Sequence, residues 1–324
     1  MTGNAQADAQ ANTQAVRRWA WRVAQVVLTL ALVAFAARQL WRQWSHASRA
    51  ELRFDLNVGW MLAASALVFV TYLLLIETWR RVLGRLGAHV AFSPAARVWF
   101  ASNLGKYIPG KIWTVTAMVV MIGKEGVPAP TAGAAAVVMT LAQLATGFAV
   151  VILTSLRAVQ ETAGGVAGVA IATVGMIACL AAAPLIARQW NRIASRFGRE
   201  QLSVDVPLSA VGIALAGCSV SWVLYGVAFR LLVYSLFGGA EGPTSAYIAA
   251  YSASYLFGYL TLFAPGGLGA REVAMAAVLP ALGLATQAQA AVITIASRLW
   301  LTGVELVPSV IAALRSATRT KLSS

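Results

Sequence analysis

The long runs of apolar residues restrict the possible folds of this chain most strongly. The hydrocarbon core of a bilayer is about 30 Å thick, so a helix that crosses it needs about 20 mostly apolar residues. Six runs are long enough, at approximately residues 20–40, 58–77, 129–156, 165–187, 208–237 and 288–314. Because lipid cannot satisfy backbone polar groups, runs of this length indicate helices. The sequence therefore predicts an all-α integral membrane protein with six full transmembrane helices.

The composition excludes an ordinary soluble domain. The chain is 59% hydrophobic and 11% charged, whereas soluble domains average roughly 45–50% apolar and about 25% charged residues. The net charge of +14 would suit nucleic acid, but the arginines stand beside the ends of apolar runs and form no single basic domain. We therefore expect anionic lipid headgroups, and no nucleic acid, as partners.

Two further apolar regions, about residues 92–126 and 244–284, are interrupted near their centres. Their central segments read "NLGKYIPGKIW" and "LFAPGGLGARE", and each contains a proline followed by glycine. Proline removes a backbone donor and glycine weakens a helix. Each region is therefore predicted to form a broken or re-entrant hairpin of two short helices.

The basic residues predict the orientation of the chain. Four groups follow or precede apolar runs: Arg17, Arg18 and Arg22; Arg80, Arg81 and Arg85; Arg188, Arg192, Arg196 and Arg199; and Arg315, Arg319 and Lys321. The positive-inside rule places all four in the cytoplasm. All four groups can lie on the cytoplasmic side only if each broken hairpin enters and leaves the membrane by the same face. We therefore expect a multi-pass protein of the cell (inner) membrane with cytoplasmic N- and C-termini.

The predicted elements fall into two halves of opposite orientation, each with the order span, span, broken hairpin, span. Repeat one would cover about residues 17–160 and repeat two about residues 161–315, together a single membrane domain (17–315). A disordered N-terminal tail (1–16) and a basic C-terminal tail (316–324) would flank it. Inverted repeats are common in secondary transporters, whose broken helices meet near the bilayer midplane. The alternative is that Pro-Gly turns recur here by chance.

The two interrupted motifs resemble the lysylphosphatidylglycerol synthase transmembrane region family, also called flippase-like domain proteins. The resemblance covers most of residues 20–315 and depends on two groups of residues: Asn103, Gly105, Pro109, Gly110 and Gly126; and Pro265, Gly266, Gly267, Gly269, Arg271, Glu272 and Gly283. It implies movement of lipids or glycolipids between leaflets. Larger members also carry a soluble aminoacyl-transferase domain, which we expect this chain, ending at Ser324, to lack together with the synthase activity.

Candidate substrate-binding residues lie in both hairpins. Lys106 and Lys111 flank the first turn, with Pro109 and Gly110, and ammonium groups beside exposed backbone N–H groups favour phosphate. The alternative is that both lysines extend to the cytoplasmic interface as anchors.

In the second hairpin, Pro265 is followed by three glycines that permit close backbone approach at the start of a helix: Gly266, Gly267 and Gly269. Arg271 either pairs with Glu272 or binds a lipid phosphate bidentately, while the Glu272 charge suits the helix N-terminus.

Arg298 and Glu305 are seven residues apart in the last span, so two helical turns return them to almost the same face. A charge at the centre of a span costs about 2.5–3.5 kcal/mol and usually faces a cavity or a partner. We expect Arg298 to bind the headgroup together with Arg271, and Glu305 or Glu272 to hold its guanidinium when the site is empty. The alternative is a permanent ion pair that locks the bundle.

No catalytic residue, metal site or cofactor is predicted, because no H-E-x-x-H, acidic cluster or Walker A motif occurs. The leading hypothesis is a lipid translocase for an anionic phospholipid, an aminoacylated lipid or a polyprenyl-linked glycolipid. The alternatives are an integral membrane enzyme or accessory subunit of glycolipid or isoprenoid-lipid biosynthesis, and a scaffold for a soluble synthase. A lipid-synthesis enzyme as partner and a homo-oligomer both remain open.

Overall fold

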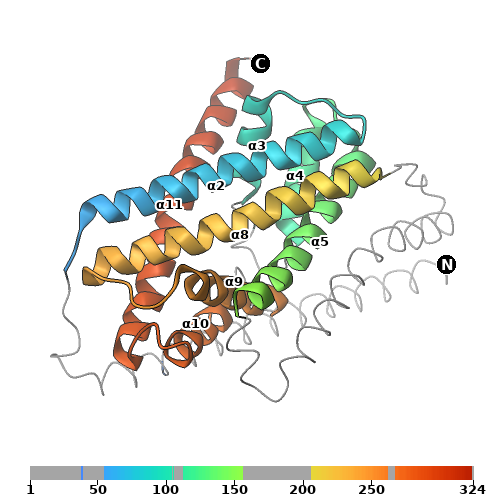
Figure 1. The fold of residues 1–324 in the computed structure, drawn as a ribbon. Coiled ribbons are helices and arrows are strands. Elements are labelled where there is room, and N and C mark those ends of the chain that lie inside the picture. Colours follow the sequence, from blue (N-terminus) through green and yellow to red (C-terminus); the bar gives the residue numbers. More distant parts are fainter. Residues whose placement is uncertain are drawn as a thin grey trace, which may run out of the picture.

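A computed structural model describes residue 38 and residues 55–103, 105, 112–155, 206–261 and 267–322. The regular structure of these residues consists of eight helices: α2 (Val58–Arg85), α3 (Phe92–Asn103), α4 (Ile112–Gly123), α5 (Ala129–Thr154), α8 (Leu208–Phe237), α9 (Thr244–Leu260), α10 (Ala270–Ala281) and α11 (Gln287–Leu322). Figure 1 shows their arrangement. The N-terminal tail and almost all of the first and fourth predicted spans lie outside the described residues.

Four helices are long and apolar enough to cross a membrane: α2, α5, α8 and the Gln287–Pro308 part of α11. The chain is therefore a multi-pass membrane protein. Two of these helices continue beyond their predicted ends. Helix α2 runs to Arg85, and α11 runs through most of the predicted basic tail to Leu322. In α2, ion pairs join Glu77, at the predicted end, to Arg80 and Arg81 in the extension, at the spacings that stabilise a helix.

Each interrupted region contains two short helices, as predicted: α3 and α4 in the first, α9 and α10 in the second. Helices α4 and α10 end in the same way. Gly126 and Gly283 have φ values of 87° and 66°, and the following N–H groups bond back over five residues, Val127 to Ile122 O and Leu284 to Leu279 O. Glycine adopts this left-handed conformation without steric cost.

Helices α2 and α8 lie side by side and antiparallel along the molecule (Figure 1). Backbone bonds from Asp55 N to Leu236 O (3.1 Å) and from Asn57 N to Ser235 O (2.9 Å) join the start of α2 to the end of α8. Gly217 of α8 allows the close approach, because a Cβ there would lie 2.1 Å from Thr78 Oγ1. Small residues at contacts between membrane helices commonly have this role.

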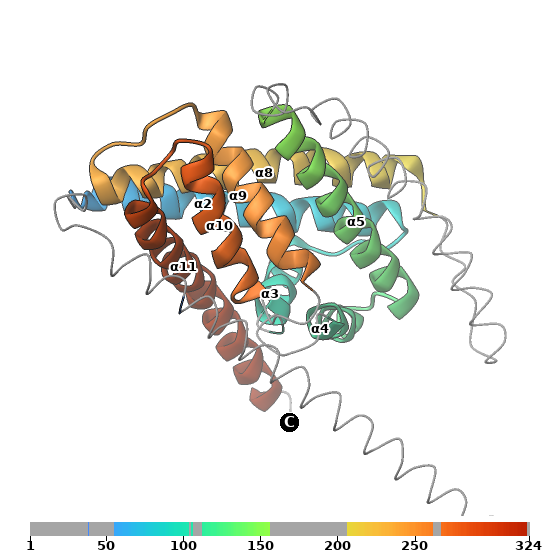
Figure 2. The same cartoon turned by 90° about the horizontal axis from the view of Figure 1, so that it is seen from below.

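The helix after each hairpin packs against the other hairpin. Helix α5, after the first hairpin, packs on α9, and α11, after the second, packs on α3 (Figure 2). Two inverted repeats related by a pseudo-twofold axis would produce this reciprocal packing. The apolar core divides accordingly into one cluster around Trp79 and another around Trp222 and Phe229.

Candidate functional site

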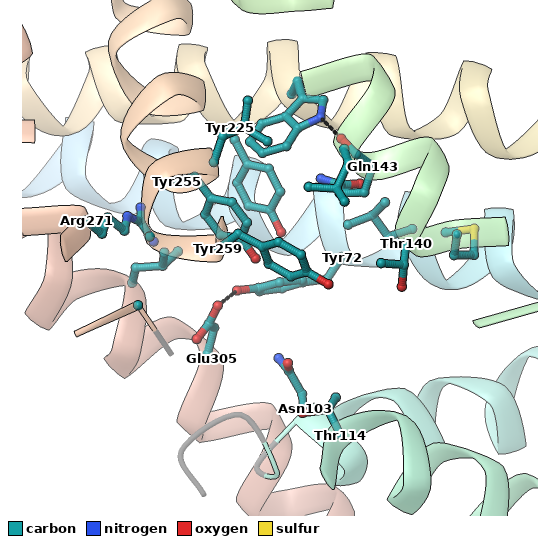
Figure 3. A pocket seen from close by; sticks show the side chains of 18 of the residues that line it. Tyr72, Asn103, Thr114, Thr140, Gln143, Tyr225, Tyr255, Tyr259, Arg271 and Glu305 are labelled. Atoms are coloured by element: carbon teal, nitrogen blue, oxygen red, sulfur yellow. Dashed lines mark hydrogen bonds between the residues drawn. The ribbon is translucent and has the colours of Figure 1, made fainter. Parts of the chain in front are cut away.

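A cavity of about 300 Å³ lies between the two hairpins, and all eight described helices contribute to its lining. Figure 3 shows many of the lining side chains. Three of the predicted site residues with charged side chains line it, namely Arg271, Arg298 and Glu305. The tertiary structure thus brings together residues of the second hairpin and of the last predicted span.

Tyrosines form the centre of this cavity. Helix α9 carries tyrosines at positions 247, 251, 255 and 259, and the last three line the cavity. Tyr225 of α8 stacks on Tyr251 with ring centroids 5.5 Å apart, and Tyr72 of α2 meets Tyr225 edge-on at 6.2 Å. The sequence analysis missed this group. The signal was the four-residue spacing in "YIAAYSASYLFGY", which places the tyrosines along one face of a helix.

Arg271 is buried, with 6% of its surface exposed. Its guanidinium carbon lies 4.9 Å from the ring centroid of Tyr251 and 5.1 Å from that of Tyr255. These distances are within the range of cation–π attraction. Among the described residues, no ion pair includes Arg271. Of the two alternatives for Arg271, the described residues therefore show no pairing with Glu272, and the cation lies over the faces of the two tyrosine rings.

Two glycines make room for Arg271. A Cβ at Gly258 of α9 would lie 2.8 Å from the Cβ of Arg271. Gly267, with φ of 72°, lies against the Gly258 backbone, where a Cβ would be 3.1 Å from three backbone atoms. Gly267 thus makes the close backbone approach that the sequence predicts.

Glu272 joins the start of α10 to α11. Its Oε2 accepts a 2.7 Å hydrogen bond from the N–H of Gly269, as the third helical residue of a capping box does. Its Oε1 lies 3.3 Å from Nε of Arg298. The exposed fractions of the two side chains are 19% for Arg298 and 12% for Glu272. The structure therefore places Glu272 in an ion pair with Arg298.

Glu305 lies along α11 from Arg298 and lines the same cavity, as their spacing predicts. Its Oε1 accepts a 2.7 Å hydrogen bond from the hydroxyl of Tyr72. This bond, drawn in Figure 3, joins α2 to α11. A second bond between these helices runs from Trp300 Nε1 to Ser65 Oγ (2.8 Å).

The remaining predicted site residues lie outside the described residues: Lys106, Pro109, Gly110, Lys111, Pro265 and Gly266. Nearby, Gly105 is described, and a Cβ there would lie 2.9 Å from the backbone nitrogen of Thr114. The glycine therefore allows the end of α3 to approach the start of α4 closely.

The cavity wall formed by α3, α4 and α5 carries uncharged polar side chains that the sequence analysis did not assign to the site: Asn103, Thr114, Thr140 and Gln143. Beside them stand Trp79, Trp99 and Trp222. The backbone oxygen of Gln143 accepts a 3.0 Å bond from Trp222 Nε1, which leaves the side-chain amide of Gln143 on the cavity (Figure 3). The described residues contain no group of three or more His, Cys, Asp or Glu that could hold a metal.

Comparison with protein families matches residues 22–307 to the lysylphosphatidylglycerol synthase TM region. A comparison with curated proteins found no match. The family match covers both hairpins and all the cavity residues.

Proposed function

The chain belongs to the family of lysylphosphatidylglycerol synthase TM regions, and on this basis we propose that it is a lipid translocase, which moves a lipid with an anionic headgroup between the leaflets of the inner membrane. The headgroup would cross through the cavity between the hairpins while the acyl chains stay in the bilayer.

The single observation that carries this proposal is Arg271. It is a buried cation at the wall of a cavity, it rests on the faces of Tyr251 and Tyr255, and among the described residues it takes part in no ion pair. Burying a charge is costly unless an opposite charge or hydrogen bonds compensate it. A phosphate matches the fork of a guanidinium bidentately. A phosphate headgroup is therefore a suitable ligand for this position.

Arg298 provides a second position for a phosphate, and Glu272 would compete with that phosphate for the guanidinium. In the structure, Glu272 pairs with Arg298. An arriving phosphate would replace one Glu272 oxygen, while the other oxygen keeps its bond to Gly269 N. Exchange of one anion for another keeps the Arg298 charge paired at each stage. Movement of one half of the molecule against the other would then open the cavity alternately to each side.

The test uses purified protein in liposomes that contain fluorescent phosphatidylglycerol, without nucleotide or activated donor. An external quencher reports the fraction of label that reaches the outer leaflet. We expect the parental protein to raise this fraction above that of empty liposomes, and Arg271→Ala to abolish the rise. Arg85→Ala, which removes an exposed arginine at the end of α2, is the matched control. If the parental protein moves no anionic lipid faster than empty liposomes do, the proposal is wrong.

A further inference from the structure

The cavity has two chemically different ends. Arg271, Arg298 and Glu305 lie at the end formed by α10 and α11. Asn103, Thr114, Thr140 and Gln143 lie at the end formed by α3, α4 and α5. In Figure 3, Arg271 lies on one side of the tyrosines and Thr140 and Gln143 lie on the other, while Glu305, Asn103 and Thr114 lie below them. A phosphate would bind only at the charged end. The uncharged end would therefore bind another part of the ligand.

The hydrogen-bonding groups of the uncharged end favour hydroxyls. Side-chain amides provide both donors and acceptors, and so does the hydroxyl of threonine. A partner for such a surface must also donate and accept at several points, as the hydroxyl groups of a sugar do. An ammonium group only donates. An ammonium group would need a carboxylate as its acceptor. Of the described residues that line the cavity, Glu305 carries a carboxylate, and it lies in α11 and already accepts a hydrogen bond from Tyr72.

Aromatic rings complete this end. Trp79 and Trp99 lie with ring centroids 5.9 Å apart, and Trp222 meets Tyr255 edge-on at 5.3 Å. Flat apolar ring faces beside a few polar groups are typical of small-ligand pockets and suit the C–H face of a sugar ring. Trp79 and Trp222 are 0% and 1% exposed, so they back the wall from behind. Trp99 is partly exposed and lines the cavity, so its ring is the one that a sugar can contact.

We propose that the headgroup is a glycosyl phosphate. Its phosphate binds at Arg271 and Arg298, and its sugar binds against Asn103, Gln143 and Trp99. This inference rests on the proposed function and narrows it to a substrate class. The volume of about 300 Å³ is at the lower end of the roughly 300–1,000 Å³ of small-molecule pockets, which suits one headgroup without its lipid chains.

The test is direct binding of soluble phosphate monoesters to the purified full chain in detergent, measured by calorimetry. Methyl phosphate has the phosphate alone, glucose 1-phosphate adds a sugar, and phosphoethanolamine adds an ammonium group. We expect glucose 1-phosphate to bind at least about tenfold more tightly than the other two, because sites built for hydroxyls reject analogues that lack them. Equal affinities, no measurable binding of glucose 1-phosphate, or tighter binding of phosphoethanolamine would overturn the inference.

A double variant locates the sugar. Asn103→Leu with Gln143→Leu removes both amides at similar side-chain size, and we expect the preference for glucose 1-phosphate over methyl phosphate to fall to within about threefold. Arg85→Ala, outside the cavity, should keep the parental preference. A double variant that folds and keeps the full preference would contradict the placement. The comparison of ligands on the parental protein needs no variant, so misfolding of the double variant leaves that result intact.

The liposome assay separates this inference from the proposed function. Movement of phosphatidylglycerol without a preference for glucose 1-phosphate would support the proposed function and contradict this inference. A preference for glucose 1-phosphate without movement of any lipid would support the binding site and contradict the proposed function. Liposomes with a glycosylated phospholipid or with a polyprenyl phosphate sugar then show which anchor carries the headgroup.

Discussion

Nε of Arg298 lies 3.3 Å from Oε1 of Glu272, so α11 forms an ion pair with the carboxylate that caps the N-terminus of α10. Glu272 thus has two partners, one in its own helix turn and one in α11. A ligand that drew Arg298 away would change the contact between α10 and α11, so in the proposed translocase this pair would couple headgroup binding to the position of the second hairpin.

Arg298→Ala should destabilise the protein, because Glu272 would lose its cation; the side chains of the pair are 19% and 12% exposed, so we expect less than the about 3–5 kcal/mol that a fully buried pair costs. Adding Glu272→Gln removes the stranded charge, and the amide oxygen can still accept from Gly269 N. We expect this double variant to recover much of the thermal stability in detergent and none of the lipid movement. Arg298→Lys keeps the positive charge but cannot bind a phosphate bidentately, so this variant should fold and lose most of the lipid movement. Parental movement by the double variant would show that the pair is only a structural lock.

The ring of Tyr255 should matter more than its hydroxyl group for holding Arg271. Tyr255→Phe keeps the aromatic face, and Tyr255→Leu removes it. A cation–π contact is worth about 0.5–2 kcal/mol, so we expect Tyr255→Leu to slow lipid movement about 2- to 30-fold and Tyr255→Phe to stay near the parental rate. The measurement is the initial rate in liposomes at equal protein content. Equal losses in both variants would assign the effect to the hydroxyl.

Two glycines of α8 give a matched pair for stability. A Cβ at Gly226 would lie 2.5 Å from the Cα of Ile248 in α9, whereas a Cβ at Gly212 would meet nothing within 4 Å. Gly226→Ala should therefore destabilise by about 1–3 kcal/mol through overpacking against backbone. Gly212→Ala should be neutral or stabilising by up to ~1 kcal/mol, because alanine favours helices. Thermal unfolding in detergent compares them, and similar stabilities would contradict the close packing of α8 on α9.

The inverted-repeat proposal predicts that the region around Gly126 is reached from the cytoplasm and the region around Gly283 from outside. Both glycines have positive φ values, so cysteines are better placed at the exposed neighbours Lys124 and Ala281. The background lacks Cys179 and Cys218. An impermeant thiol reagent applied to intact cells should label Ala281→Cys and leave Lys124→Cys unlabelled until the membrane is opened. Labelling of both from one face would end the proposal.

Replacement of both Lys106 and Lys111 by glutamine should lower lipid movement while expression and topology persist, and replacement of both by glutamate should lower it further. The reason is loss of two positive charges next to the first turn, where an anionic headgroup would approach. Lys124→Gln, at an exposed position after α4, is the control. Normal movement by the double glutamine variant would show that the two lysines only anchor the hairpin at the interface.

The sequence by itself determined where the described helices lie and where the two apolar regions break. Both follow from chemistry that is local in the chain, since span length is set by the bilayer and breaks by proline and glycine. The sequence also placed Arg298 and Glu305 on one helix face. Only the tertiary structure decided that Glu272 pairs with Arg298 and that tyrosines hold Arg271. Tyr72 and Glu305 are 233 residues apart in the chain. Contacts over such separations depend on how helices pack against one another, and the periodicity of a single helix does not specify its partner.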